Sequence, residues 1–177
     1  APGLKVETLA LDLVAPGAME TLEERLRSAN GGTLPGDRPL RILVNNAGFG
    51  TYGDFDDTPL ELSLGQVDIN CRAVTEACAR LSPFLSRGAV VINVASLAAF
   101  APLGGFAVYA ASKAYCLSLS VGLASEWKAR GIRVCALCPG PVASEFALVA
   151  SAGARREVRH GWSADRTAAL CLRDAGR

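Results

Sequence analysis

Three short runs of mostly apolar, largely β-branched residues constrain the fold of this 177-residue chain more than any other feature. They occupy residues 41–44, 89–95 and 132–138. Apolar runs of this length are typical of parallel strands that are covered on both faces. Each run is followed by a polar or glycine-bearing turn and then by a segment with a helical pattern. The sequence therefore predicts an α/β fold built on a doubly wound parallel sheet.

Hydrophobic periodicity and turn residues predict the remaining elements. The expected elements are a strand over residues 6–13 and helices over residues 19–30, 60–85, 106–130 and 163–174, the last of them capped by Ser163. Pro83 should end or bend the second of these helices, because proline removes a backbone donor. Residues 141–162 are expected to form a substrate-side loop with a short helix.

The pair Tyr109 and Lys113 points to acid–base chemistry. Four residues apart on a helix, the two side chains lie on one face. A lysine ammonium stabilises a nearby phenolate, which predicts a pKa for Tyr109 below the usual value of about 10. A tyrosine tuned in this way can exchange a proton with an alcohol or a carbonyl at neutral pH. An ordinary pair on a helix surface is the alternative interpretation of the spacing alone.

These pieces together resemble the short-chain dehydrogenase/reductase family over roughly residues 4–150. The matching residues, in the order of the family, are Asn45, Asn46, Ala47, Gly48, Asn70, Ser96, Tyr109, Lys113, Pro139, Gly140, Pro141 and Val142. The resemblance implies one partial Rossmann-like domain over residues 1–177. The opening strand, its glycine-rich turn and the last strand of the family are not found in this sequence, so a longer parent protein is expected.

The missing turn bears on function, since in the family its backbone N–H groups hold the pyrophosphate of the cofactor. The chain by itself is therefore expected to bind NAD or NADP weakly and to be inactive. Without the missing strands, the strand expected at residues 6–13 should either stay at its family position, with a gap between it and residues 42–44, or pair directly with them.

The resemblance also implies roles for single residues in a reversible hydride transfer between nicotinamide and a carbonyl or secondary alcohol. Tyr109 is the expected acid and base, Lys113 its partner and a ligand of the nicotinamide ribose, and Ser96 the group that binds the substrate oxygen. Asn70 is expected to hold a water that connects Lys113 to solvent, although an exposed helix position is its alternative interpretation.

Cofactor and substrate contacts follow from the same resemblance. The expected cofactor-binding residues are Asp12, Asn46, Ala47, Gly48, Tyr109, Lys113, Pro139, Gly140, Val142 and Ser144. Asn45 is expected to tie neighbouring strands together, and Asp12 has a plain loop carboxylate as its alternative. Besides Ser96, the residues expected at the substrate are Leu97, Phe100, Leu103, Phe106 and Phe146, which favour an apolar molecule. The cofactor is NAD or NADP, with a lean to NADP from the likeness to a bacterial branch of the family.

The helix expected over residues 106–130 has no charged residue between Lys113 and Glu126. A helix that is apolar nearly all round must be covered on both sides. The sheet can cover one side, and a second copy of the chain is the simplest cover for the other. The sequence therefore predicts a homodimer or homotetramer that pairs through residues 106–130.

Composition narrows the remaining possibilities. A formal net charge of +1 gives no long-range field for nucleic acid or an anionic membrane, and no uninterrupted apolar stretch of spanning length is present. The six cysteines lie in apolar segments, which is typical of buried thiols in a reducing cytoplasm. Cys135 and Cys138 should point to opposite faces of a strand, and His160 is the only histidine, so no metal site is predicted.

Two functions thus stand beside each other. The first is an NAD(P)-dependent oxidoreductase, and the second is a catalytically silent relative that acts as a protein-interaction module through residues 106–130. The intact set of Ser96, Tyr109, Lys113 and Asn70 favours the first, whereas the missing glycine-rich turn favours the second.

Overall fold

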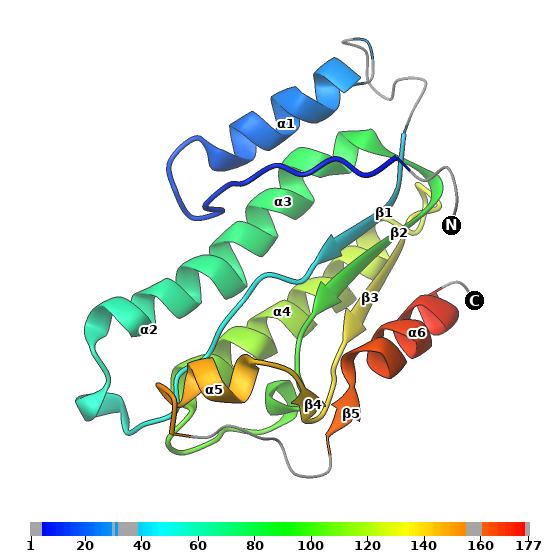
Figure 1. Cartoon of the computed structure of the whole chain (residues 1–177). Coiled ribbons are helices and arrows are strands. Elements are labelled where there is room, and N and C mark those ends of the chain that lie inside the picture. The colour runs from blue at the N-terminus through cyan, green and yellow to red at the C-terminus, as the bar shows by residue number, and fades with distance from the viewer. Residues whose placement is uncertain (1–4, 30, 32–38, 155–160, 176–177) are drawn as a thin grey trace.

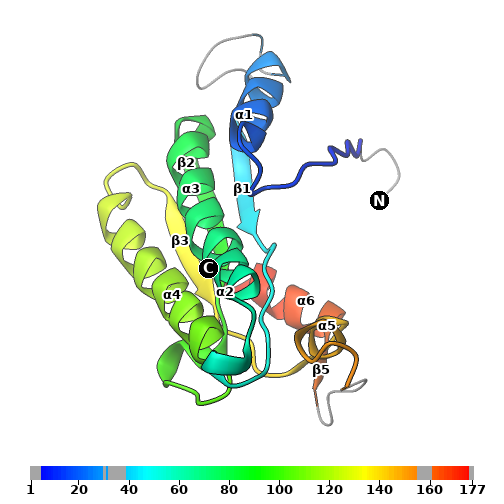
Figure 2. The same ribbon diagram turned by 90° about the vertical axis from the view of Figure 1, so that its left-hand side faces the viewer.

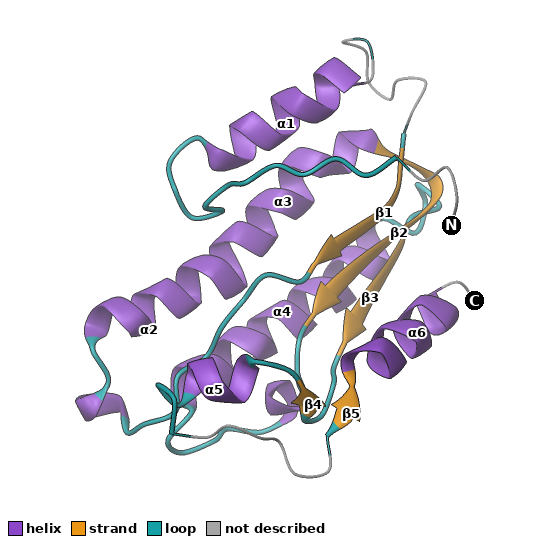
Figure 3. Ribbon diagram, viewed as in Figure 1, coloured by secondary structure: helices purple, strands orange, loops and turns teal. Residues whose placement is uncertain are grey.

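A three-stranded parallel sheet forms the centre of the structure, a computed structural model that describes residues 5–29, 31, 39–154 and 161–175 (Figure 1). Its strands are β1 (Leu40–Asn45), β2 (Leu85–Val94) and β3 (Arg133–Leu137), in the order β1-β2-β3. All three run in the same direction, and all three were expected from their apolar runs. Their carboxyl ends meet at one edge of the sheet, as Figure 3 shows by the arrowheads.

Helices cover both faces of the sheet, as a doubly wound fold requires (Figure 2). On one face, Val91 of β2 belongs to a core with α3 (Ala73–Leu81) and α4 (Ala107–Glu126). On the other face, Ile92 packs with Ala175 of α6 (Ala164–Ala175). The predicted Rossmann-like α/β architecture is therefore correct. The helix α6 also begins as expected, because the Ser163 hydroxyl accepts a hydrogen bond of 3.2 Å from the Arg166 backbone N–H.

The first helix, α1 (Ala18–Ala29), matches its expected range and packs on α3. Its buried Met19 lies in a second core with Leu81 and Phe84. Arg80 of α3 adds ion pairs to Glu20 and Glu23 of α1, the latter at 3.2 Å. Apolar packing and these ion pairs together hold α1 against α3, and Leu40 and Leu43 of β1 pack against the same cluster.

The strand expected over residues 6–13 is wrong. Residues 5–12 form no regular secondary structure and pair with no strand. They are largely exposed and extend away from α1 and α3 (Figure 2), although Glu7 accepts from Arg25 of α1 and, just after the segment, Val14 O accepts from Arg72. A strand needs a free neighbouring edge for its backbone groups, and these contacts hold the segment away from β1. Neither arrangement expected for this segment is therefore found.

The helix expected over residues 60–85 is correct in extent but is not one regular helix. It consists of α2 (Leu60–Val67), a π-helical turn (Asp68–Arg72), α3 and a closing 3-10 turn (Ser82–Phe84). Pro83 lies in the closing turn, so it ends the helix as expected. Asn70 lies in the π-helical turn, a distortion that is frequent at functional sites.

The long helix α4 confirms the segment expected over residues 106–130 in all but its ends. Within the described residues it is the one helix long and apolar enough to cross a membrane, with a mean hydropathy of 1.2. Its inward face packs on β3 and buries Ser112, Lys113 and Ser120. Contact with the protein core therefore covers one side of α4 only, since 33% of its apolar stretch is buried.

Short elements complete the carboxyl edge of the sheet. These are the 3-10 turns Phe55–Asp57 and Leu97–Phe100, helix α5 (Phe146–Ala150) and a small parallel pair of β4 (Val142–Ala143) and β5 (Trp162–Ser163). The short helix expected within residues 141–162 is thus present as α5. Figure 1 shows that α5, β4 and β5 lie beyond the ends of the strands, where a ligand would approach the sheet.

Candidate active site

Four polar side chains meet at the carboxyl edge of the sheet from three separate parts of the chain. Ser96 follows the end of β2, and Tyr109 and Lys113 lie one turn apart on α4. Asn70 reaches the same region from the π-helical turn. The Ser96 hydroxyl accepts a hydrogen bond of 3.1 Å from the Ala98 backbone N–H and lies close enough to the Tyr109 phenol to lower its pKa.

The Tyr109 phenol is buried, with only 7% of the residue exposed. Burial raises the pKa of Tyr109 above its ordinary value, the Ser96 hydroxyl lowers it, and the Tyr52 phenol raises it. The lowered pKa expected from the sequence is therefore wrong for the chain by itself. The reason is that the Lys113 ammonium lies 5.7 Å from the centre of the Tyr109 ring and donates instead to the Val94 carbonyl, at 2.8 Å.

Lys113 is as buried as Tyr109, with 6% of the residue exposed. Loss of hydration lowers the pKa of its ammonium group, while the Cys116 and Cys71 thiols raise it. A buried ammonium near a phenol is held at an energetic cost, which is common in sites that carry out proton transfer.

Asn70 is 1% exposed, so its alternative interpretation as an exposed helix position is wrong. Its amide nitrogen donates to the Phe49 carbonyl and to the Ser112 hydroxyl, each at 2.9 Å. The amide oxygen is buried and has no hydrogen-bond partner within the described residues. It lies beside Gly48, where an added Cβ would come within 2.4 Å of the oxygen and 3.4 Å of the Lys113 ammonium.

A cluster of aromatic rings surrounds the Tyr109 phenol. The Phe106 ring stacks on the Tyr109 ring and on the Tyr52 ring, with 4.3 Å between centroids in each case. The Phe146 ring lies 5.3 Å from the Tyr109 ring. Phe106 and Phe146 were expected here, but Tyr52 was not. The available signal was its position within the glycine-rich stretch of residues 48–53. Glycines there allow the backbone to approach the Tyr109 ring, since Gly50 has no room for a Cβ against that ring.

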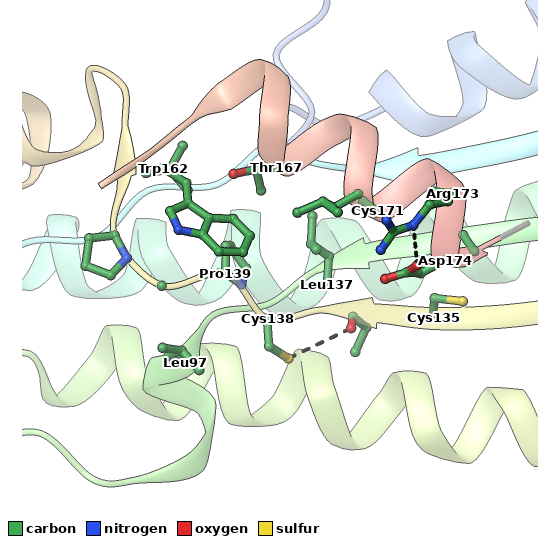
Figure 4. Close-up of a pocket in the computed structure, with 16 residues that line it drawn as sticks. Leu97, Cys135, Leu137, Cys138, Pro139, Trp162, Thr167, Cys171, Arg173 and Asp174 are labelled. Atoms are coloured by element: carbon green, nitrogen blue, oxygen red, sulfur yellow. Dashed lines mark hydrogen bonds and ion pairs between the residues drawn. The ribbon is translucent and has the colours of Figure 1, made fainter. Parts of the chain in front are cut away.

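A cavity of about 750 Å³ opens between β3, with the turn that follows it, and α6 (Figure 4). It is lined by Pro139, Gly140 and Val142, which were expected at the cofactor, and by Leu97, which was expected at the substrate. The Leu97 backbone N–H donates to the Pro139 carbonyl at 3.0 Å, so the turns after β2 and β3 are joined. Trp162, Thr167 and Cys171 line the same cavity and were not anticipated, since they follow no recognised pattern.

The other expected cofactor residues lie in three different places. Asn46, Ala47 and Gly48 are exposed directly after β1, at the same edge of the sheet. Ser144 lies outside the cavity lining, where its hydroxyl accepts from the Phe146 N–H at 3.4 Å. Asp12 is in the exposed loop before α1 and accepts from the Val14 N–H, so it does not end a strand.

Asn45 has the linking position that the sequence predicted. Its amide nitrogen donates at 2.8 Å to Asn93, the residue paired with it on β2. Asn93 is fully buried and donates in turn to the Ser120 hydroxyl of α4, at 3.0 Å. The chain of hydrogen bonds from Asn45 to Ser120 therefore fixes β1, β2 and the helix that carries Tyr109 relative to one another.

Phe100 and Leu103 were expected at the substrate but do not line the cavity between β3 and α6. They line a separate groove of about 510 Å³ with Ala110, Ala111 and Ala114 of α4. Tyr109 and Phe106 are not part of that groove lining, so the structure does not bring Phe100 and Leu103 into the aromatic cluster.

The two cysteines at the end of β3 face in opposite directions, as expected. Cys135 packs toward α6 and Cys138 toward the core beneath α4. The described part of the chain holds no group of three or more metal-binding side chains, and His160 lies outside the described residues.

Comparison with known proteins identifies the family and the fold of the chain. The family model for short chain dehydrogenases matches residues 4–154. The chain belongs to the short-chain dehydrogenase family. Serine 3-dehydrogenase of Rhizobium radiobacter is a relative with 38% identity over 136 residues, which cover 75% of this chain and 54% of that protein.

Solved structures of the short-chain dehydrogenase family have a similar fold. The enzyme from Sphingobium yanoikuyae in complex with NADPH aligns with a TM-score of 0.77 and 30% identity, over 92% of this chain and 62% of that one. The enzyme from Burkholderia cenocepacia J2315 in complex with NADP aligns with a TM-score of 0.77 and 31% identity, over 94% and 67%. The chain thus spans about half the length of its curated relative and about two thirds of these structures.

Burial of Lys113 leads to a prediction about stability and pH. Because the pKa of Lys113 is lowered in the folded state, the unfolded state binds more protons below pH 10.5. The destabilisation caused by burying the Lys113 ammonium is present in full below the pKa of the folded state. It is lost as pH rises toward the pKa of the unfolded state. Lys113→Met should therefore unfold at a higher denaturant concentration than the wild type at pH 7, and the difference should shrink by pH 10.

Lys128→Met provides the control, since Lys128 is exposed just beyond the end of the same helix. Its stability should stay within about 0.5 kcal/mol of the wild type at both pH values. A Lys113→Met protein that is less stable than the wild type at pH 7 would show that the buried ammonium stabilises the fold.

Proposed function

We propose that this protein is an NAD(P)-dependent oxidoreductase that transfers hydride between nicotinamide and a carbonyl or secondary alcohol. The observation that supports it is the convergence of Ser96, Tyr109, Lys113 and Asn70 at the carboxyl edge of the sheet, three of them at most 7% exposed. A hydroxyl, a phenol and an ammonium in one buried site are the groups that proton transfer to a carbonyl oxygen requires.

The residues present fit the nicotinamide end of such a cofactor. The cavity lined by Pro139, Gly140 and Val142 is large enough for a planar ring and adjoins Leu97, next to Ser96. Gly48 has no side chain, which lets the Asn70 amide oxygen and the Lys113 ammonium lie against its backbone, next to the region where the ribose would bind. When bound, nicotinamide would supply or accept the hydride. NADP is the favoured form, because two structural neighbours are complexes with NADPH or NADP.

Each side chain then has a role that follows from its contacts. Tyr109 gives its phenolic proton to the substrate oxygen during reduction and takes it back during alcohol oxidation. Ser96, close to the Tyr109 phenol, donates to the same oxygen and stabilises its developing charge. The Lys113 ammonium holds the ribose hydroxyls and favours the phenolate once it turns from the Val94 carbonyl.

The substrate is an apolar small molecule. The rings of Tyr52, Phe106 and Phe146 surround the Tyr109 phenol, and Leu97, next to Ser96 in the chain, lines the cavity. A charged substrate would lose its hydration among these side chains without gaining a partner. Ser144 and Asn46 are the polar groups left to contact the carboxamide and the adenosine ribose of the cofactor.

Removing the phenolic hydroxyl tests the catalytic role of Tyr109. In the protein expressed from its complete gene, Tyr109→Phe should reduce the rate of carbonyl reduction by about 10²–10⁴-fold, the contribution typical of a general acid. The ring remains stacked on Phe106, so folding and cofactor affinity should change little. Steady-state rates and calorimetric cofactor titration measure the two quantities.

Tyr115→Phe is the matched control, because Tyr115 lies on the same helix but is exposed and bonded to Thr75. It should retain the wild-type rate. Wild-type turnover by Tyr109→Phe would exclude Tyr109 as the acid, and no NAD(P)-dependent turnover by the wild type would favour the silent interaction module instead.

The 177-residue chain alone should bind either cofactor weakly and reduce no carbonyl. Within the described residues no turn of the Gly-x-x-x-Gly-x-Gly type leads from a strand into a helix, so the pyrophosphate lacks its usual backbone donors. Isothermal titration with NAD and NADP measures the affinity. A micromolar dissociation constant would contradict the proposal and would require another phosphate site.

The assembly is a homodimer or homotetramer in the cytoplasm that pairs through the outer face of α4. Ala107, Ala111, Ala114 and Val121 are exposed there, and Leu64 of α2 is exposed nearby. Val121→Glu places a charge on this face, so it should convert the oligomer to a monomer in sedimentation velocity runs. A wild-type protein that sediments as a monomer would contradict the proposal.

A further inference from the structure

Ser112, the residue before Lys113, has a position that the proposed reaction does not yet use. It is 3% exposed and lies between Asn70 and the backbone of α4. Its hydroxyl donates to the Tyr109 carbonyl at 2.8 Å and accepts from the Asn70 amide nitrogen at 2.9 Å. One hydroxyl therefore joins the turn that carries Tyr109 to the π-helical turn that carries Asn70.

The direction of these hydrogen bonds determines how the Asn70 amide is turned. A serine hydroxyl has one proton, and that of Ser112 is used on the Tyr109 carbonyl. Its oxygen can then only accept, and the other contact of the amide, the Phe49 carbonyl, is also an acceptor. Both acceptors require the nitrogen edge of the amide, so the oxygen edge must face the opposite side.

On that opposite side lies the ammonium of Lys113. The space beside Gly48 is shared by the Asn70 amide oxygen and the Lys113 nitrogen, since a Cβ there would be 2.4 Å from one and 3.4 Å from the other. The amide oxygen has no donor within the described part of the chain, and buried acceptors are rarely left without one. An ammonium, directly or through a water, is the donor nearest to this space.

We infer that Ser112 is a positioning residue, whose hydroxyl keeps the Asn70 amide oxygen turned toward the Lys113 ammonium and so holds that ammonium in its charged form. The inference rests on the proposed function, because the charge matters only if Lys113 stabilises the Tyr109 phenolate. Ser112 itself touches neither substrate nor cofactor in this scheme.

Other titratable groups near Lys113 do not replace this contact. The Cys116 thiol faces it from α4 and the Cys71 thiol from the π-helical turn, and burial raises the pKa of both thiols. They are therefore neutral near pH 7 and offer no negative charge. From α4 the Tyr109 phenol faces it, and from β2 only the Val94 carbonyl accepts from it.

The pH dependence of alcohol oxidation provides the test, because Tyr109 must be deprotonated to act as the base. Without the Ser112 hydroxyl only the Phe49 carbonyl still holds the nitrogen edge of the amide, so the amide oxygen is held less firmly toward Lys113. The Lys113 charge is then less stabilised, and the phenolate forms at higher pH. In the protein expressed from its complete gene, Ser112→Ala should move the rising limb of kcat/KM by about half a unit to one unit toward higher pH. Its rate should approach that of the wild type near pH 10.

Two further variants separate positioning from packing. Ser112→Thr keeps the hydroxyl and should return the limb toward the wild-type pH, while Ser28→Ala, an exposed serine of α1, should not move it. A Ser112→Ala protein with a lower rate at every pH and an unmoved limb would overturn the inference, because a loss of packing alone acts in that way. A Ser112→Thr protein that behaves like Ser112→Ala would overturn it too.

A second measurement does not depend on turnover. Hydrogen exchange of the Asn70 side-chain amide, followed by NMR, should be slow in the wild type and at least tenfold faster in Ser112→Ala. Unchanged exchange would overturn the inference even if the enzyme is active. Faster exchange in a protein without NAD(P)-dependent activity would support the positioning while excluding the proposed function.

Discussion

The parallel pairing of β2 with both of its neighbours is the interaction on which the rest of the structure depends. Residues 89–92 of β2 are at most 6% exposed, so this strand is covered on both faces as well as paired along both edges. Ser96 lies just beyond its end, and the Asn93 amide links it to β1 and α4. A strand that is enclosed in this way cannot shift its register without breaking both cores at once. The sheet therefore determines where the residues of the candidate site lie.

The candidate site conflicts with the energetics of the fold around it. A buried ammonium, a buried phenol and an amide oxygen without a partner are each unfavourable in an apolar interior. They are tolerated because the surrounding cores of α3 and α4 supply the free energy of folding. In the proposed reaction the same burial would strengthen the field of Lys113 at Tyr109 once the ammonium turns from the Val94 carbonyl, since a charge acts more strongly where water is excluded. Stability and proton transfer thus depend on one arrangement in opposite ways.

Much of this could be predicted from the sequence because the signals were local. The β-branched runs of β1, β2 and β3 and the periodicity of α4 identify elements whose burial is decided by neighbouring residues. The strand predicted over residues 6–13 was wrong because a strand pattern in the sequence does not indicate whether a free edge of the sheet lies nearby. The prediction of a lowered pKa for Tyr109 was wrong for a similar reason. The spacing to Lys113 does not reveal that the ammonium turns to the Val94 carbonyl. Tyr52 and Ser112 were missed because their contacts are made across the fold.

The outer edge of β1 has a consequence for the behaviour of the chain in solution. Within the described residues β1 pairs only with β2, and its Ile42 and Val44 side chains are about half exposed on the face that α6 leaves uncovered. Unpaired backbone groups beside apolar side chains are a template for another extended segment. Concentrated samples of the chain alone would tend to aggregate through this edge, by a route independent of α4. Polar substitutions at Ile42 and Val44 would then improve solubility without altering the catalytic end of the sheet.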